Sequence, residues 1–141
     1  MGNCLKDCKM RSFLIILCVS LFVRQNKAYT LQQRQQGDVF ALECLAETGV
    51  NPASIAQLKV GDFSADDQRS KCFVRCFFEK EGFMNDKGGL LTDSVIEALS
   101  SDFDREKVEA VMTKCQVDEK KDACDTAFQV YECLYTNRES L

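Results

Sequence analysis

Residues 70–83 read SKCFVRCFFEKEGF and place Cys72 and Cys76 four positions apart among aromatic side chains. In a helix, which turns by about 100° per residue, these two side chains leave one face about 40° apart. Their Cβ atoms would lie roughly 5–6 Å apart, whereas a disulfide needs about 3.8 Å. The pair therefore cannot form a disulfide with itself within a helix, and in an oxidised protein each cysteine bonds to a different segment.

The start of the chain has the pattern of a secretion signal. A basic stretch, residues 6–11, precedes an apolar run over residues 12–23. That run is shorter than the roughly 20 residues that a membrane helix needs, and Ala28 suits a cleavage site. We expect a signal peptide over residues 1–28 and a single secreted, extracellular domain over residues 29–141, with a retained signal anchor as the alternative.

Loss of this leader would change the charge and the cysteine count. It would remove five of 18 basic and one of 22 acidic residues, which leaves 13 and 21 and a net charge of −8. It would also remove Cys4, Cys8 and Cys18 and leave six of nine cysteines. The acidic balance argues against binding to nucleic acid or to an anionic membrane. Six cysteines in a small secreted domain predict three disulfides, for which 15 pairings exist.

The remaining sequence favours helices. Pro52 is the only proline, and β-branched residues do not alternate over any long stretch. Caps and stop signals predict six helices in an all-α fold. Their expected bounds are Leu31–Thr48, Pro52 towards Val60, a capping box Ser64–Asp67 through to Gly82, Thr92 as a cap through Leu99, Asp102 or Asp104 through Lys114, and Asp122–Thr136.

The last expected helix also contains two cysteines, and the same helical geometry applies to them. Cys124 and Cys133 are nine residues apart, which is half a turn after whole rotations, so they face opposite sides of one helix. We therefore expect both this helix and the helix that contains Cys72 and Cys76 to be bonded to two neighbours each. The sequence predicts a cross-linked all-α domain.

The same residues argue against metal binding and catalysis. The chain has no histidine, and its C-x3-C and C-x8-C intervals fit neither zinc sites nor C-x-x-C redox pairs. The missing histidine also removes the commonest general base and nucleophile partner. Adjacent acids such as Asp66 and Asp67 usually form a solvated helix face. We therefore expect no metal, no cofactor and no enzymatic activity.

The six cysteines carry a family resemblance. The pattern C44-x27-C72-x3-C76-x38-C115-x8-C124-x8-C133, after a signal peptide, resembles the insect odorant-binding proteins of the pheromone- and general-odorant-binding group. The stretch KCFVRCFFEKEGFM also looks like that family's local pattern. The resemblance implies about six helices around an apolar cavity and three interlocked disulfides, Cys44–Cys76, Cys72–Cys124 and Cys115–Cys133.

Apolar stripes on the helices supply candidate pocket residues. By pattern alone each of them is plain core, whereas the resemblance implies that many line a cavity. The expected ligand-binding residues are Phe77, Val95, Leu99, Val108, Val111, Met112, Phe128, Tyr131 and Tyr135. The tyrosine hydroxyls are candidate polar contacts for a ligand with one oxygen group.

These observations predict a secreted, non-enzymatic carrier that reversibly binds small apolar organic ligands, such as odorants or pheromones. The expected protein is a monomer or weak homodimer with no stable membrane insertion, and a chemosensory receptor is a candidate partner. The alternative is a disulfide-stapled interaction or effector protein with a solid core. Because the chain lacks histidine and only eight residues follow Cys133, we expect its affinity to change little between pH 7 and 5.5.

Overall fold

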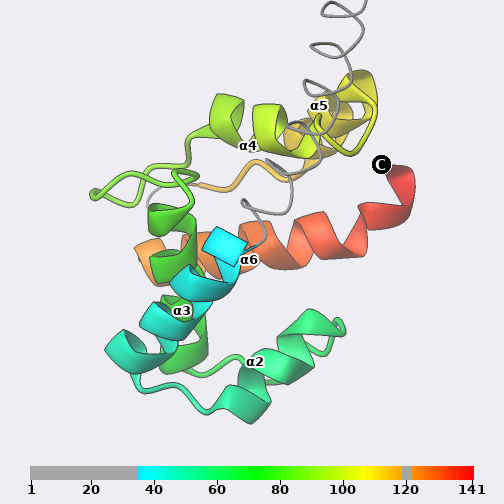
Figure 1. Ribbon diagram of the computed structural model, residues 1–141. Coiled ribbons are helices and arrows are strands. Elements are labelled where there is room, and N and C mark those ends of the chain that lie inside the picture. The colour runs from blue at the N-terminus through cyan, green and yellow to red at the C-terminus, as the bar shows by residue number, and fades with distance from the viewer. Residues whose placement is uncertain (1–34, 119–121) are drawn as a thin grey trace, which may run out of the picture. The chain divides into compact units, whose positions relative to one another are not determined.

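The described residues, 35–118 and 122–141 of a computed structural model, fold into helices joined by short turns (Figure 1). An isolated bridge pairs Met84 with Leu90, and the described residues contain no strand. The elements are a first helix, described over residues 35–48, followed by α2 (Pro52–Lys59), α3 (Gln68–Lys80), α4 (Thr92–Leu99), α5 (Arg105–Lys114), α6 (Ala123–Thr136) and the 3-10 turn η1 (Arg138–Ser140). The expected all-α class with six helices is confirmed.

Residues Val39–Leu141 form one compact unit, and the contacts below belong to it. The expected leader, residues 1–28, and the expected start of the first helix at Leu31 lie outside the described residues. Among the residues that are described, no helix is both long and apolar enough to cross a membrane.

Acidic or amide side chains cap most of the helices. Asn51 caps α2 ahead of Pro52, and Asp104 and Asp122 cap α5 and α6. A side-chain oxygen that accepts from the first free N–H groups satisfies donors that have no partner within the helix. The expected cap and first-turn proline of α2 are confirmed, and Asp104 rather than Asp102 begins α5.

Two expected caps are wrong. The cap of α3 is Asp67, whose Oδ1 accepts from the amides of Arg69 and Ser70, so the helix begins after Ser64 and not at it. Thr92 is the first residue of α4, and the capping position is Leu91, which makes no side-chain hydrogen bond. A serine or threonine before a helix is a capping candidate, but it caps only where its own backbone is extended.

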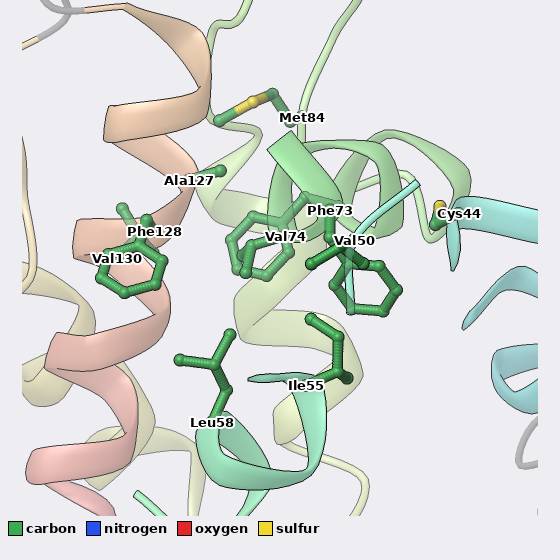
Figure 2. Close-up of a cluster of buried hydrophobic side chains, with 11 residues drawn as sticks. Cys44, Val50, Ile55, Leu58, Phe73, Val74, Met84, Ala127, Phe128 and Val130 are labelled. Carbon is green, nitrogen blue, oxygen red and sulfur yellow. The ribbon is translucent and has the colours of Figure 1, made fainter. Parts of the chain in front are cut away.

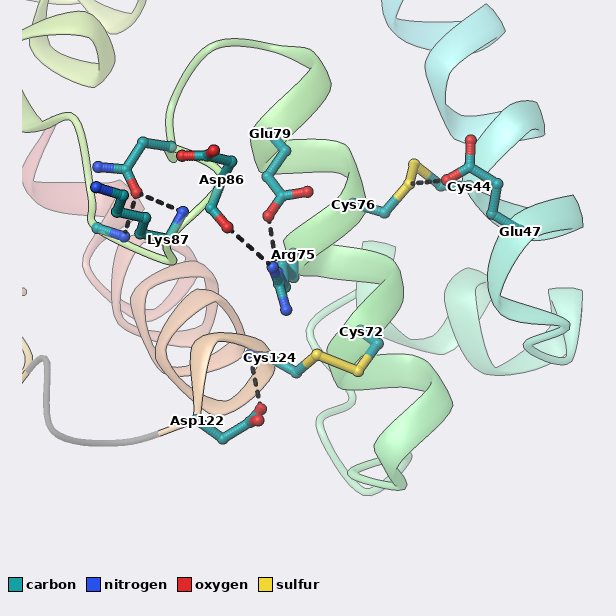
Figure 3. Close-up of polar contacts among 12 residues, drawn as sticks. Cys44, Glu47, Cys72, Arg75, Cys76, Glu79, Asp86, Lys87, Asp122 and Cys124 are labelled. Atoms are coloured by element: carbon teal, nitrogen blue, oxygen red, sulfur yellow. Dashed lines mark hydrogen bonds and ion pairs between the residues drawn. A yellow bond between two sulfur atoms is a disulfide. The ribbon is translucent and has the colours of Figure 1, made fainter.

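Three disulfides connect different pairs of elements, and Figure 3 shows the first two. Their Cα–Cα distances are 5.8, 4.5 and 5.6 Å for Cys44–Cys76, Cys72–Cys124 and Cys115–Cys133 respectively. The first joins the first helix to α3, the second joins α3 to α6, and the third joins the end of α5 to α6. These are the pairs that the family resemblance implies, and α3 and α6 are each bonded to two neighbours.

Ion pairs follow the same helix pairs as two of the disulfides. Lys71 of α3 lies 2.9 Å from Asp125 of α6, next to Cys72–Cys124. Lys80 of α3 contacts Glu43 and Glu47 of the first helix, each at 2.9 Å. Partly exposed pairs of this kind contribute little stability, so the disulfides tie these helices together more strongly than the ion pairs do.

Buried side chains form two clusters. The first lies where the first helix, α2, α3 and α6 meet, and Figure 2 shows Ile55 and Leu58 of α2 directed toward Phe73 and Val74 of α3. The second joins α4 and α5 through Val95, Ile96, Val108 and Met112, with Leu99 and Leu141 packed against it.

Candidate ligand-binding pocket

An apolar pocket of about 210 Å³ lies within the first cluster. Its wall combines residues from four helices: Ala41 from the first helix, Ile55, Leu58 and Lys59 from α2, Phe73, Val74, Phe77 and Phe78 from α3, and Tyr131 from α6. An engineered apolar cavity of about 150 Å³ is known to hold benzene. The pocket is therefore large enough for a small organic molecule.

The α3 wall comes from the stretch of sequence that contains the paired cysteines. Phe73 and Phe77 follow Cys72 and Cys76 by one residue each, so they form a parallel stripe about 100° around the helix. The same four-residue repeat therefore serves two purposes on α3. The cysteines fasten the helix to its neighbours, while the phenylalanine stripe faces the pocket.

The α2 wall depends on a short, well-capped helix. The Asn51 side chain accepts from the Ala53 amide at 2.9 Å, and proline follows at the first helical position. These features start α2 so that Ile55 and Leu58, three residues apart, share its inner face and are buried. Lys59 ends the helix, and its side chain is exposed.

Tyr131 fixes the position of α2 against α6. Its hydroxyl donates a hydrogen bond to the backbone oxygen of Leu58 at 3.3 Å. Burial raises the pKa of the Tyr131 hydroxyl above its ordinary value, and Tyr135 contributes in the same direction, so the hydroxyl keeps its proton at neutral pH. The phenol of Tyr131 is thus committed to the protein backbone as a donor.

An aromatic cluster lies beside Tyr131. Phe63, in the loop after α2, packs edge-on against Phe128, Tyr131 and Tyr135, with ring centroids 6.0, 5.9 and 5.6 Å away. Such edge-to-face contacts stabilise beyond their area burial. They hold the loop that follows α2 onto α6.

The nine residues expected to bind ligand separate into three groups. Phe77 and Tyr131 line the pocket, and Phe128 and Tyr135 belong to the neighbouring aromatic cluster. The remaining five lie on α4 and α5, where Val111 is buried and the other four, Val95, Leu99, Val108 and Met112, form or contact the second cluster. For all nine residues, contact with a ligand stays a prediction, and the pocket geometry supports it for Phe77 and Tyr131.

Sequence reasoning did not assign the α2 residues to a site. Ile55 and Leu58 have the i, i+3 spacing of an inward face, which is the signal that could have found them. Ala41 and Lys59 carry no such signal, because neither a small residue nor an exposed lysine marks a pocket.

A second hollow, of about 280 Å³, has a more polar wall made by Leu90, Thr92, Gln116, Val117 and Thr126. Three of these five side chains are polar. This wall suits water better than an apolar guest, and the pocket beside α2 is the stronger candidate.

Comparison with known proteins identifies related chains. The model of the PBP/GOBP family matches residues 26–137. Odorant-binding protein 10 of Aedes aegypti is 33% identical over 103 residues, 72% of this chain and 73% of that protein. General odorant-binding protein 56a of Drosophila melanogaster is 30% identical over 129 residues, 89% of this chain and 92% of that protein.

A solved structure of an odorant-binding protein is also similar to this chain. The fatty acid binding protein OBP56a from the oral disk of the blowfly Phormia regina is 34% identical in sequence and aligns with a TM-score of 0.64. The alignment covers 78% of this chain and 95% of the blowfly chain.

Proposed function

Because the chain belongs to the PBP/GOBP family, we propose that it is a carrier that reversibly binds small, largely apolar organic molecules in the pocket beside α2. The observation that carries the proposal is a 210 Å³ apolar space inside a disulfide-tied helical domain. Apolar surface removed from water contributes about 25 cal/mol per Å², so such a space binds a matching hydrocarbon without any chemical step.

The relatives support a ligand of this kind. The blowfly protein is named a fatty acid binding protein, and a fatty acid is a ligand with a hydrocarbon chain. The mosquito and fly relatives are named odorant-binding proteins. We propose transport of an odorant-like or other semiochemical ligand through extracellular fluid, with delivery to a chemosensory receptor as its olfactory form.

The carrier is secreted and performs no reaction. Cleavage of residues 1–28 releases the domain of residues 29–141, as the basic and apolar leader predicts. The pocket wall is almost entirely hydrocarbon, and its phenol, on Tyr131, is engaged by a backbone carbonyl. One chain builds the whole wall, so a monomer or a weak homodimer suffices.

The pocket and the family together favour a carrier over a stapled interaction protein with a solid core. A solid core would leave no space of this size between the side chains of its walls. Here eight uncharged side chains surround a volume that the protein leaves empty.

The proposal is tested by filling the pocket. In Ala41→Trp the indole ring would enter the space between the first helix and α3. We expect this variant to bind the neutral fluorescent reporter N-phenyl-1-naphthylamine at least tenfold more weakly than the wild type, because the ring occupies the ligand's place. Affinities come from fluorescence titration of protein that far-UV circular dichroism shows to be helical.

The matched control is Ala110→Trp, which places the same ring on the exposed face of α5 and should bind within twofold of the wild type. Met112→Ala should also keep the reporter affinity, since Met112 lies in the second cluster. Reporter binding by Ala41→Trp that matches the wild type would overturn the assignment, and a loss confined to Met112→Ala would move the ligand to α4 and α5.

A further inference from the structure

We infer that the pocket selects ligands with an anionic head group, and that Lys59 is the residue that selects them. The inference rests on the proposed carrier function and names the chemical class of its ligand: a medium-length hydrocarbon chain that ends in a carboxylate.

Charge at the pocket is confined to one residue. Of the described residues that line the wall, Lys59 alone is charged, and the other eight are apolar or aromatic. Lys59 is the last residue of α2; it is exposed to solvent, and it is one of the residues that line the pocket. Lysine commonly covers apolar surface with its methylene stem and keeps its ammonium group in water. A ligand whose chain lies inside the pocket would therefore present its head group to this ammonium.

The ammonium of Lys59 is available to a ligand. Ion pairs between described residues engage Lys71, Arg75, Lys80 and Arg105, and none of them includes Lys59. This separates Lys59 from Lys71 and Lys80, which lie on α3 and have carboxylate partners 2.9 Å away. A carboxylate arriving at the pocket would not have to displace an ion-pair partner that the described residues provide.

The Tyr131 hydroxyl, the other polar group of the wall, also favours a ligand with a carboxylate head group. The Tyr131 hydroxyl donates its hydrogen bond to the backbone oxygen of Leu58. It therefore has no hydrogen left to donate to a ligand. Lys59 supplies the donors that remain, and an ammonium has three of them and no acceptor. A ligand group that only accepts hydrogen bonds and carries negative charge matches this wall better than a hydroxyl or an amine does.

The position of this charge also opposes the protein's overall field. Without the expected leader the domain has 13 basic and 21 acidic residues, a net charge of −8, which repels anions at long range. Screening limits that repulsion to about 8–10 Å in physiological salt. At contact distance the ammonium of Lys59 dominates, so the preference is local to the pocket.

The test compares head groups on one chain length. Octanoate, 1-octanol and octylammonium are titrated against bound N-phenyl-1-naphthylamine in the wild type and in Lys59→Gln, Lys59→Arg and Lys59→Glu. We expect Lys59→Gln to weaken octanoate about fivefold, the factor that about 1 kcal/mol of a partly exposed ion pair gives, and to leave 1-octanol within twofold. Lys59→Arg should keep the wild-type affinity for octanoate.

Charge reversal at Lys59 distinguishes an electrostatic role from a structural one. A structural role would change the affinities for anionic and cationic ligands in the same direction. Lys59→Glu should weaken octanoate further and strengthen octylammonium relative to the wild type. Lys107→Gln removes an exposed lysine of α5 and should change none of the affinities by more than twofold.

The outcomes separate this inference from the proposed function. If octanoate and 1-octanol both displace the reporter but Lys59→Gln leaves octanoate unchanged, the head-group inference is overturned while the carrier function stands. If neither ligand nor the reporter binds the wild type, the carrier function itself fails.

Discussion

Single residues at the edges of α2 set the geometry of the pocket. Gly61 follows the helix with a φ of 82°, a conformation that residues with a Cβ rarely adopt. A Cβ built at this position would overlap the ring of Tyr135, which is itself held against Phe63 at 5.6 Å and Arg138 at 4.2 Å. Glycine is therefore needed here both for its backbone and for the space it leaves.

We predict that Gly61→Ala is more destabilising than Gly82→Ala. Both positions have positive φ, which costs alanine about 1–2 kcal/mol, but a Cβ at Gly82 meets no atom within 4 Å. The overlap with Tyr135 should add about 1–3 kcal/mol to the loss at Gly61. Urea unfolding of the two variants measures the difference, and equal losses would show that the Tyr135 ring moves aside without cost.

Among the elements, α3 is the one whose role is clearest from sequence. The spacing of Cys72 and Cys76 alone shows that this helix is bonded to two neighbours, and the structure has those two bonds. The existence and order of the helices were likewise predictable, and for three of them Asn51, Asp104 and Asp122 mark the start.

The pocket could not be predicted to the same degree. Each helix shows which of its faces is apolar, but not whether the facing side chains meet or leave a space between them. Met112 and Phe77 have equally good patterns, yet Met112 is packed in the second cluster and Phe77 borders the pocket. The difference arises from the distances between helices, which depend on the disulfides and loops and are not encoded in any one stripe.

Loss of different disulfides should affect ligand binding differently. Replacing Cys72 and Cys124 by alanine frees α3 from α6, two walls of the pocket, whereas replacing Cys115 and Cys133 frees α5 from α6. We expect the first double variant to lose at least fivefold in reporter affinity and the second to stay within twofold. Titration of both, after circular dichroism has shown that they remain helical, checks this.

Stability should fall in both variants. The bonds close chain segments of 52 and 18 residues, for which the chain-entropy relation gives about 4 and 3 kcal/mol. Urea unfolding measures these losses. Equal reporter affinities in the two double variants would show that the disulfide between α3 and α6 does not shape the pocket.

For the whole molecule, an empty pocket is a cost that the covalent ties offset. Cavity volume destabilises by about 24 cal/mol per Å³ in one series of core variants, which for 210 Å³ gives roughly 5 kcal/mol. This is an upper bound, because the pocket is partly open. Net stabilities of domains are only about 5–15 kcal/mol, whereas each disulfide contributes about 2–4 kcal/mol. Three such bonds are enough to keep an under-packed interior folded.

The charged groups predict little pH dependence near neutrality. Hydrogen bonds from Ser70 hold the pKa of Asp67 below its ordinary value, and those from Ser64 do the same for the pKa of Asp62. Their stabilisation is present above the unfolded value near 4 and is lost as the pH falls through the lowered pKa. The pKa of Lys71 is raised, first by its hydrogen bond to Asp125, and its stabilisation is lost only as the pH rises through that raised value, above 10.

Glu81 differs from Asp62 and Asp67, because its pKa is raised and not lowered. Burial raises the pKa of Glu81, so its folded state favours the protonated form, and that contribution is lost as the pH rises through the raised pKa. Glu81 does not line the pocket. It can therefore shift stability in mild acid without changing the contacts that a ligand makes.

We accordingly expect the affinity for the neutral reporter to differ by less than threefold between pH 7 and 5.5. The chain has no histidine, the residue that most often changes charge over this range. Parallel titrations at the two pH values measure the ratio. A tenfold loss would contradict the expectation and would require a carboxylate that controls the pocket.

The wall made by α2 differs from the others in one respect that affects how quickly a ligand exchanges. The first helix, α3 and α6 are joined by disulfides, while α2 contains no cysteine and lies between Gly49 and Gly61, both with positive φ. It is held by the burial of Ile55 and Leu58 and by the hydrogen bond from Tyr131. Separation of α2 alone therefore opens a route for release and leaves every covalent bond intact, so the residence time of a ligand follows a local opening equilibrium and not the far rarer unfolding of the domain.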